Sequence, residues 1–147
     1  MNRLNLITLG VNDMQESLAF YRDGLGFEVV VYGEENNPSV IFFNNAGTKI
    51  SLFPIDQLSK DINEENPPAK ANVFSGITLA YNGKSKQEVD EVFAKAEKAG
   101  AIIVKHPEPV FWGGYSGYFR DPNGFYWEVA YGENWQFDEN DMLIITK

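Results

Sequence analysis

The sequence predicts an α+β fold built from two βαβββ modules in a pseudo-twofold arrangement. The segment ITLGVN at positions 7–12 returns seventy positions later as ITLAYN at positions 77–82. Each copy precedes a stretch with apolar residues at helical spacing that ends near a glycine, and short alternating segments typical of strands follow. We therefore expect one domain, residues 1–147, that contains two copies of the same unit.

The first module covers about residues 3–55. Apolar and polar residues alternate over positions 4–11, which predicts a strand. Asp13 is then expected to cap a helix that carries Met14 and Leu18 on one face and ends at Gly26. Three more strands are expected at residues 27–32, 40–43 and 49–53.

The second module covers about residues 73–132. A strand is expected at residues 77–82, followed by a helix over residues 84–98 that ends near Gly100. Three strands are expected after it, at residues 101–105, 117–119 and 125–131. Residues 56–72 are polar and acidic and contain two consecutive prolines, which predicts a linker or mobile loop. Residues 133–147 form a tail with a turn at 138–141 and a short apolar strand.

Composition narrows the classes of partner. Twelve basic and twenty-one acidic residues give a formal charge of −9, which disfavours nucleic acid and suits neutral or cationic molecules. The chain has no cysteine, so disulfides and thiolate metal sites are excluded, and a reducing compartment such as the cytoplasm is expected. No apolar run is long enough to span a membrane. We expect a cytoplasmic protein whose partner is a small molecule.

Glu128 is the principal candidate for site chemistry. The residues DPNG at positions 121–124 predict a tight turn, and the strand after it places Tyr126, Glu128 and Ala130 on one face. A buried carboxylate there could anchor a ligand or act as a catalytic base. Alternatively, Glu128 is structural and is satisfied by hydroxyl groups, for which Ser51, Thr78 and Thr8 are the candidates.

The segment VFWGGYSGYF at positions 110–119 combines aromatic residues with glycines. Aromatic rings with polar tips suit an apolar pocket with a few oriented hydrogen bonds, and Gly113 and Gly114 suit a hinge. We therefore expect Trp112 and Tyr115, together with Tyr126, to bind a ligand. A dimer interface or ordinary core is the alternative use of these rings.

Three segments in this order resemble the vicinal oxygen chelate superfamily, which includes glyoxalase I, bleomycin-resistance proteins and extradiol dioxygenases. They are ITLGVNDMQESLAFYRDGLGF at positions 7–27, the restart at 76–82, and GYFRDPNGFYWEVA at 117–130. The resemblance covers roughly residues 3–132. It implies a glyoxalase-like fold in which two βαβββ modules form a cup of curled sheets, with the active site inside the cup, and pairing of chains in homodimers.

Metal-bearing members of this superfamily hold a divalent ion through four positions, which the resemblance places at Leu6, Ser51, Gly76 and Glu128. Only Glu128 matches, since Leu6 and Gly76 offer no lone pair and divalent ions need roughly four to six ligands. His106, the only histidine, follows the strand expected at 101–105 and lies outside those positions. We therefore expect no metal and no cofactor.

Two functions remain open on this basis. The first is metal-independent binding of a small aromatic or cationic molecule, as in drug-sequestering, bleomycin-resistance-like proteins. The second is catalysis by a glyoxalase-superfamily lyase, isomerase or dioxygenase that works through Glu128. The aromatic segment and the missing ligands favour binding.

Overall fold

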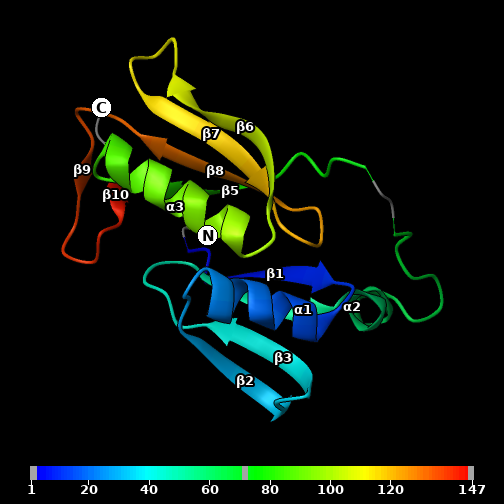
Figure 1. Ribbon diagram of the computed structural model, residues 1–147. Coiled ribbons are helices and arrows are strands. Elements are labelled where there is room, and N and C mark those ends of the chain that lie inside the picture. The colour runs from blue at the N-terminus through cyan, green and yellow to red at the C-terminus, as the bar shows by residue number, and fades with distance from the viewer. Residues whose placement is uncertain (1–2, 71–72, 146–147) are drawn as a thin grey trace. The chain divides into compact units, whose positions relative to one another are not determined.

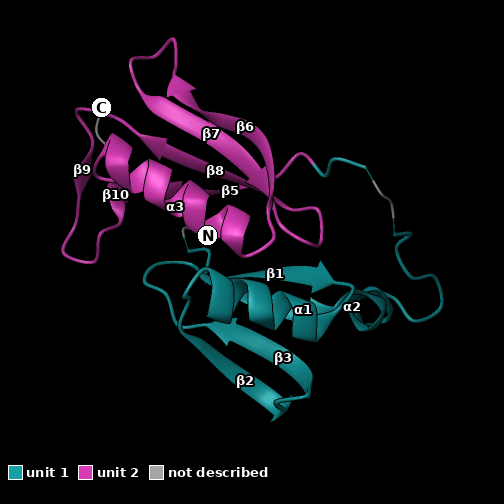
Figure 2. Cartoon of the chain, in the orientation of Figure 1, with its two compact units in different colours: residues 1–75 teal, residues 76–147 magenta. Residues whose placement is uncertain are grey.

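The computed structural model describes residues 3–70 and 73–145, and the chain divides into two compact units. Unit 1 is Met1–Ser75 and unit 2 is Gly76–Lys147 (Figure 2). Each unit contains one four-stranded sheet with a helix across one of its faces (Figure 1). The predicted α+β class and the two βαβββ modules are therefore confirmed.

Unit 1 follows the expected order of one strand, a helix and three strands, with a second helix after them. Its elements are β1 (Leu6–Val11), α1 (Met14–Leu18), the π-helical turn η1 (Ala19–Gly24), β2 (Val29–Glu34), β3 (Asn37–Phe43), β4 (Lys49–Pro54) and α2 (Ile55–Ile62). The strands lie in the order β1-β4-β3-β2, with β1 parallel to β4 and the other pairs antiparallel.

The first helix begins and ends at the predicted residues. The Asp13 carboxylate accepts hydrogen bonds from the backbone N–H groups of Gln15, at 2.8 Å, and Glu16, at 2.9 Å. These bonds satisfy donors that a helix start otherwise leaves unpaired. Gly26 follows the helix with φ of 81°, a conformation that favours glycine.

The core of unit 1 lies between this helix and one face of the sheet. Leu9, Ile41 and Leu52 are buried there, and the Tyr21 ring meets the Phe43 ring edge-on at 5.0 Å. Along β1 and β4 the residues between these buried ones project from the opposite face. We call that opposite face the helix-free face of the sheet, because α1 and η1 do not cross it and, among the described residues of this unit, only α2 meets it, at Gly10.

Helix α2 was not predicted, because residues 56–72 were expected to be a linker. Its apolar residues Ile55, Leu58 and Ile62 recur at helical spacing, a pattern that the surrounding charges obscure. Gly10 of β1 leaves room for α2, since a Cβ atom there would lie 3.0 Å from Ile55 Cγ1. Residues 71 and 72 of the expected linker lie outside the described residues.

Unit 2 repeats the plan of unit 1 and adds a short hairpin. Its elements are β5 (Thr78–Asn82), α3 (Lys86–Lys98), β6 (Ile102–Pro109), β7 (Tyr115–Arg120), β8 (Tyr126–Tyr131), β9 (Gln136–Phe137) and β10 (Leu143–Ile144). The order β5-β8-β7-β6, with β5 parallel to β8, matches that of unit 1. Among the described residues, no helix has the length and apolar character needed to cross a membrane.

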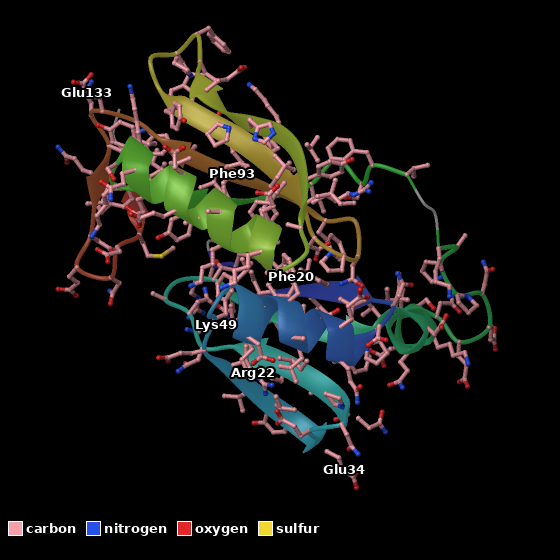
Figure 3. All side chains as sticks on the ribbon, in the orientation of Figure 1. Phe20, Arg22, Glu34, Lys49, Phe93 and Glu133 are labelled. Carbon is pink, nitrogen blue, oxygen red and sulfur yellow. The ribbon has the colours of Figure 1, made fainter. Side chains whose placement is uncertain are left out.

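Helix α3 packs on the second sheet through Phe93, which Figure 3 shows between the helix and the strands. The Phe93 ring meets the Phe119 ring edge-on at 6.1 Å, and Phe119 stacks on Trp127 at 6.2 Å. Gly117 is required beneath this helix, because a Cβ atom there would lie 2.7 Å from the Phe93 ring. Phe119 and Trp127 thus mark the helix-covered face of β7 and β8.

Strand β6 is longer than predicted and includes His106, which was expected to follow the strand. The added part of the strand contains two prolines, at positions 107 and 109. Proline is tolerated in β6 because this strand lies at the edge of its sheet, and its register with β7 shifts around Lys105. His106 is exposed on this edge strand.

Candidate functional site

Glu128 lies on the helix-free face of the second sheet. Its neighbours along β8, Trp127 and Val129, are buried on the opposite, helix-covered side. Alternation therefore places Tyr126, Glu128 and Ala130 together, as the sequence predicted. The turn that starts β8 is held by buried Asp121, whose carboxylate accepts the backbone N–H of Phe125 at 2.7 Å.

Four half-buried side chains form a square on this face. Glu128 pairs in register with Tyr118 of β7, and Tyr126 pairs with Arg120 of the same strand. Tyr118 and Arg120 alternate with Phe119, so they project away from α3 like their partners. One diagonal of this four-residue square joins a carboxylate to a guanidinium, and the other joins two phenols.

The carboxylate of Glu128 contributes to a raised pKa of the Tyr118 phenol. The pKa of Tyr118 is raised, first by burial and then by the negative charge of Glu128 and a hydrogen bond to that carboxylate. Tyr118 therefore keeps its proton at neutral pH and can donate it to an oxygen acceptor. This arrangement differs from the expected alternative in which serine or threonine hydroxyls satisfy Glu128.

Two stacked indoles lie at the end of the same face. Trp112 and Trp135 have ring centroids 5.7 Å apart and planes 15° apart. Each indole ring lies against a glycine. A Cβ atom on Gly114 would clash with the Trp112 ring, and one on Gly132 would clash with the Trp135 ring. Both glycines fall on the helix-free face if the alternation of β7 and β8 continues past the strand ends. The glycines therefore make room for the indole pair.

Tyr115, which was expected to line the ligand site, lies on the helix-covered face. Its hydroxyl donates to the carboxylate of Asp90 on α3 at 2.9 Å, and the Lys86 ammonium lies 5.8 Å from its ring centroid. The hydrogen bond to Asp90 raises the pKa of Tyr115. The structure thus brings Tyr126 beside Glu128, places Trp112 at the end of their face, and directs Tyr115 elsewhere.

The first sheet carries a different group at the matching place. Ser51 of β4 pairs in register with Thr8 of β1, as Glu128 of β8 pairs with Ala80 of β5. The Ser51 and Thr8 hydroxyl oxygens are 2.9 Å apart, so one donates to the other. By register, Thr8 therefore matches Ala80, two positions beyond the match that the ITLGVN repeat suggested.

A hollow of about 450 Å³ lies in unit 1, away from these residues. Its lining comes from residues 12–15, 36–39, 54 and 57 and is mainly polar. None of the predicted site residues lines it. The candidate site is therefore the helix-free face of the second sheet, and the hollow is not part of it.

A family model agrees with the geometry. The model for the Glyoxalase/Bleomycin resistance protein/Dioxygenase superfamily matches residues 3–129. The chain belongs to this superfamily. An uncharacterized protein of Bacillus subtilis (strain 168), YraH, is 27% identical over 122 residues, which are 82% of this chain and 91% of that protein.

Solved structures of glyoxalase relatives share the fold. A crystal structure of a glyoxalase-related enzyme from Fulvimarina pelagi matches with a TM-score of 0.87 and 25% identity and covers 100% of both chains. A lactoylglutathione lyase from Agrobacterium tumefaciens matches with a TM-score of 0.66 and 28% identity, over 93% of this chain and 98% of that one. These relatives confirm the glyoxalase-like resemblance.

The residues at the superfamily's metal positions do not fit a divalent ion. Leu6 and Gly76 have no ligand atom, and the Ser51 hydroxyl is engaged with Thr8. Within residues 3–70 and 73–145, no three or more His, Asp or Glu side chains gather closely enough to hold a metal. We therefore derive no chemistry through a metal ion.

Sequence reasoning missed Tyr118 and Arg120, although a signal for both was present. A tight turn at residues 121–124 makes the two strands beside it antiparallel neighbours. In the structure Asp121 faces Phe125, so the loop is residues 122–124, and counting outward from it pairs Arg120 with Tyr126 and Tyr118 with Glu128. Counting from the predicted turn at residues 121–124 would instead pair Arg120 with Phe125. The hairpin therefore brings Tyr118 and Arg120 beside the strand of Glu128, but their register depends on the loop length, which the structure supplies.

Proposed function

We propose that this chain is a small-molecule-binding protein of the glyoxalase superfamily. The ligand is an aromatic or cationic molecule that lies on the helix-free face of the second sheet. The single observation that carries the proposal is the half-buried carboxylate of Glu128, which stands beside two phenols and forms no ion pair among the described residues. A carboxylate in this setting is an available anchor for a cation.

The surrounding rings support the same class of ligand. Tyr118 and Tyr126 flank Glu128, and Trp112 covers the end of the face. A cation over an aromatic ring gains roughly 0.5–2 kcal/mol, and an aromatic pair adds a similar amount. Several such contacts, added to the burial of an apolar ring, are sufficient for binding at about micromolar concentration, which corresponds to about 8 kcal/mol. The formal charge of −9 further favours cations.

The test compares phenethylamine, an aromatic cation, with the neutral 2-phenylethanol. We expect phenethylamine to quench tryptophan fluorescence and to raise the melting temperature by mass action. Glu128→Gln should weaken phenethylamine binding about tenfold with little effect on 2-phenylethanol, and Trp112→Ala should weaken both. Glu97→Gln, which removes the same charge from an exposed position on α3, is the matched control.

The fold of each variant must be checked before binding is interpreted. Glu128→Gln should change the free energy of unfolding by less than about 1 kcal/mol, because no ion pair is broken. A loss above about 3 kcal/mol would indicate a buried ion pair instead. Equal affinity of wild type and both site variants for phenethylamine would refute the proposed site.

A second candidate is a superfamily enzyme of the lyase, isomerase or dioxygenase kind. The resemblance to the Agrobacterium tumefaciens lactoylglutathione lyase and the Tyr118–Glu128 pair, which could donate and accept protons, favour it. Glyoxalase-type turnover of a thiol adduct, measured with and without added nickel or zinc, tests this candidate. Turnover abolished by Glu128→Gln would replace the binding function with catalysis.

The proposal includes the oligomeric state of the protein and its location in the cell. We propose a homodimer, following the resemblance to paired superfamily members, and light scattering that gives the mass of one chain would refute it. We also propose a cytoplasmic protein, since the chain contains no cysteine to be oxidised. Fractionation of the cells that make the protein tests this location.

A further inference from the structure

We propose that the ligand is amphoteric, of the aromatic α-amino acid type, and that Arg120 binds its carboxylate while Glu128 binds its ammonium group. This inference rests on the proposed function of the Glu128 face. It adds a second charged contact, which nothing in the sequence analysis assigned. Tyr118 and Tyr126 complete the four-residue square around the head of the ligand.

Arg120 is a half-buried cation without an acceptor. In the part of the chain that the structure describes, its guanidinium donates no hydrogen bond and forms no ion pair. Other cations are engaged: Arg22 pairs with Asp23 and Glu35, and Lys105 pairs with Glu108 at 3.1 Å. Lys95 and Lys98 also lack an ion pair among the described residues, but both are exposed to solvent, whereas Arg120 is half-buried, where an unpaired charge is costly. A guanidinium is the side chain best suited to bind a carboxylate through two parallel hydrogen bonds.

The spacing of the two charges leaves room for a small group between them. Arg120 and Glu128 are diagonal neighbours on adjacent strands, since Glu128 faces Tyr118 and Arg120 faces Tyr126. Diagonal neighbours on a sheet face are about 7–8 Å apart, within reach of long side chains that converge. No ion pair joins these two residues directly. The head of an amino acid, with its ammonium and carboxylate on one carbon, fits between them.

The opposite charges of Arg120 and Glu128 favour a zwitterion over a ligand with a single charge. A ligand with only a carboxylate would be attracted by Arg120 but repelled by Glu128. A ligand with only an ammonium group would be attracted by Glu128 but repelled by Arg120. A zwitterion satisfies both groups and leaves the face neutral. The phenol of Tyr118 donates its hydrogen bond to Glu128 and so holds that carboxylate in place for the ammonium group, while the aromatic part of the ligand contacts the ring of Tyr126.

The test uses three probes that share one ring and differ in charge: L-phenylalanine, phenethylamine and 3-phenylpropanoate. Calorimetric titration should give L-phenylalanine an affinity at least about tenfold above that of either singly charged probe. Arg120→Gln should lower L-phenylalanine affinity about tenfold and leave phenethylamine equal or tighter. Glu128→Gln should weaken phenethylamine and L-phenylalanine and leave 3-phenylpropanoate equal or tighter.

Two further variants control the experiment. Arg120→Lys keeps the charge but loses the planar fork, so its affinity for L-phenylalanine should fall between those of wild type and Arg120→Gln. Lys98→Gln removes a positive charge from an exposed position on α3 and should change no affinity. Without ligand, the effects of Arg120→Gln and Glu128→Gln on stability should be additive, because the two side chains do not pair.

The outcomes separate this inference from the proposed function. If phenethylamine binds through Glu128 but L-phenylalanine binds no tighter, the role of Arg120 is wrong and the binding function stands. If none of the probes binds, the binding function itself fails for this class of ligand and the amphoteric inference fails with it. Strong coupling between Arg120 and Glu128 without ligand would show an internal ion pair and would also overturn the inference.

Discussion

The helix-free faces of the two sheets have the same strand order and different chemistry. In the first, the position opposite Thr8 and Phe42 is Ser51, whose hydroxyl is satisfied by a hydrogen bond to Thr8. In the second, the matching position is Glu128, which lies opposite Ala80 and Tyr118. The backbone repeats, and one face holds a closed hydroxyl pair while the other holds a carboxylate without a cation.

The two copies of the repeat therefore share the residues that the fold requires and differ in the side chains of the candidate site. In both sheets the helix-covered face is filled by buried apolar side chains, such as Leu52 and Val129, because a helix must bury its apolar stripe there. Among the described residues, the opposite face meets no helix of its own unit except α2, which packs against β1 and β4 of the first sheet. The side chains of this face can therefore differ between the two sheets, and the second sheet places Glu128 and Arg120 there.

The largest expected effect comes from moving the carboxylate from one face to the other. Ser51→Glu should lower the free energy of unfolding by about 3 kcal/mol or more, because Ser51 is 2% exposed and its hydroxyl is already bonded to Thr8, so a carboxylate there would be buried without a partner. Glu128→Ser should cost less than about 1 kcal/mol. Chemical denaturation at neutral pH measures both, and Ser51→Gln separates size from charge. Equal losses for the two exchanges would mean that the faces do not differ as described.

A smaller effect is expected from the turns before the last strand of each module. Asp121→Ala should cost about 2–3 kcal/mol, because the 2% exposed carboxylate accepts the backbone N–H groups of Asn123 and Phe125. Asn44 stands three positions before Gly47, as Asp121 stands before Gly124, but its side chain is exposed. Asn44→Ala should therefore change stability by less than about 0.5 kcal/mol. Thermal denaturation of both variants sharpens the comparison, and a larger loss at Asn44 contradicts it.

The smallest effect is a dependence on alkaline pH that arises in unit 2. Burial, together with a 2.5 Å hydrogen bond to Glu88 and the charges of Glu88 and Asp141, raises the pKa of Tyr81 to about 12. A pKa raised by folding gives stability that is complete below the unfolded value of about 10 and is lost as pH rises toward the folded value. Unfolding free energies measured from pH 9 to 12 should fall less in Tyr81→Phe than in wild type. Tyr32→Phe, which removes an exposed phenol from β2, is the control, and superimposable profiles of wild type and Tyr81→Phe would contradict the prediction.

Much of the fold could be predicted because its signals are local. Asp13 caps its helix, the turn at residues 121–124 joins two strands, and Glu128 shares a face with Tyr126, all as the sequence indicated. The predictions that failed involve competing signals. Charged residues hid the amphipathic pattern of α2, and β6 runs past residue 105 because an edge strand tolerates prolines.

The sequence by itself determined the two modules, their caps and turns, and the alternation that puts Glu128 on one face, because these depend on neighbouring residues and on periods of 2 and 3.6. Only the tertiary structure decided which face the helix covers and which strands lie together. Tyr115 faces Asp90 instead of Glu128, and Trp112 stacks on Trp135. Such contacts join residues that are distant in sequence, and the burial of a whole face selects them, so no local period can specify them.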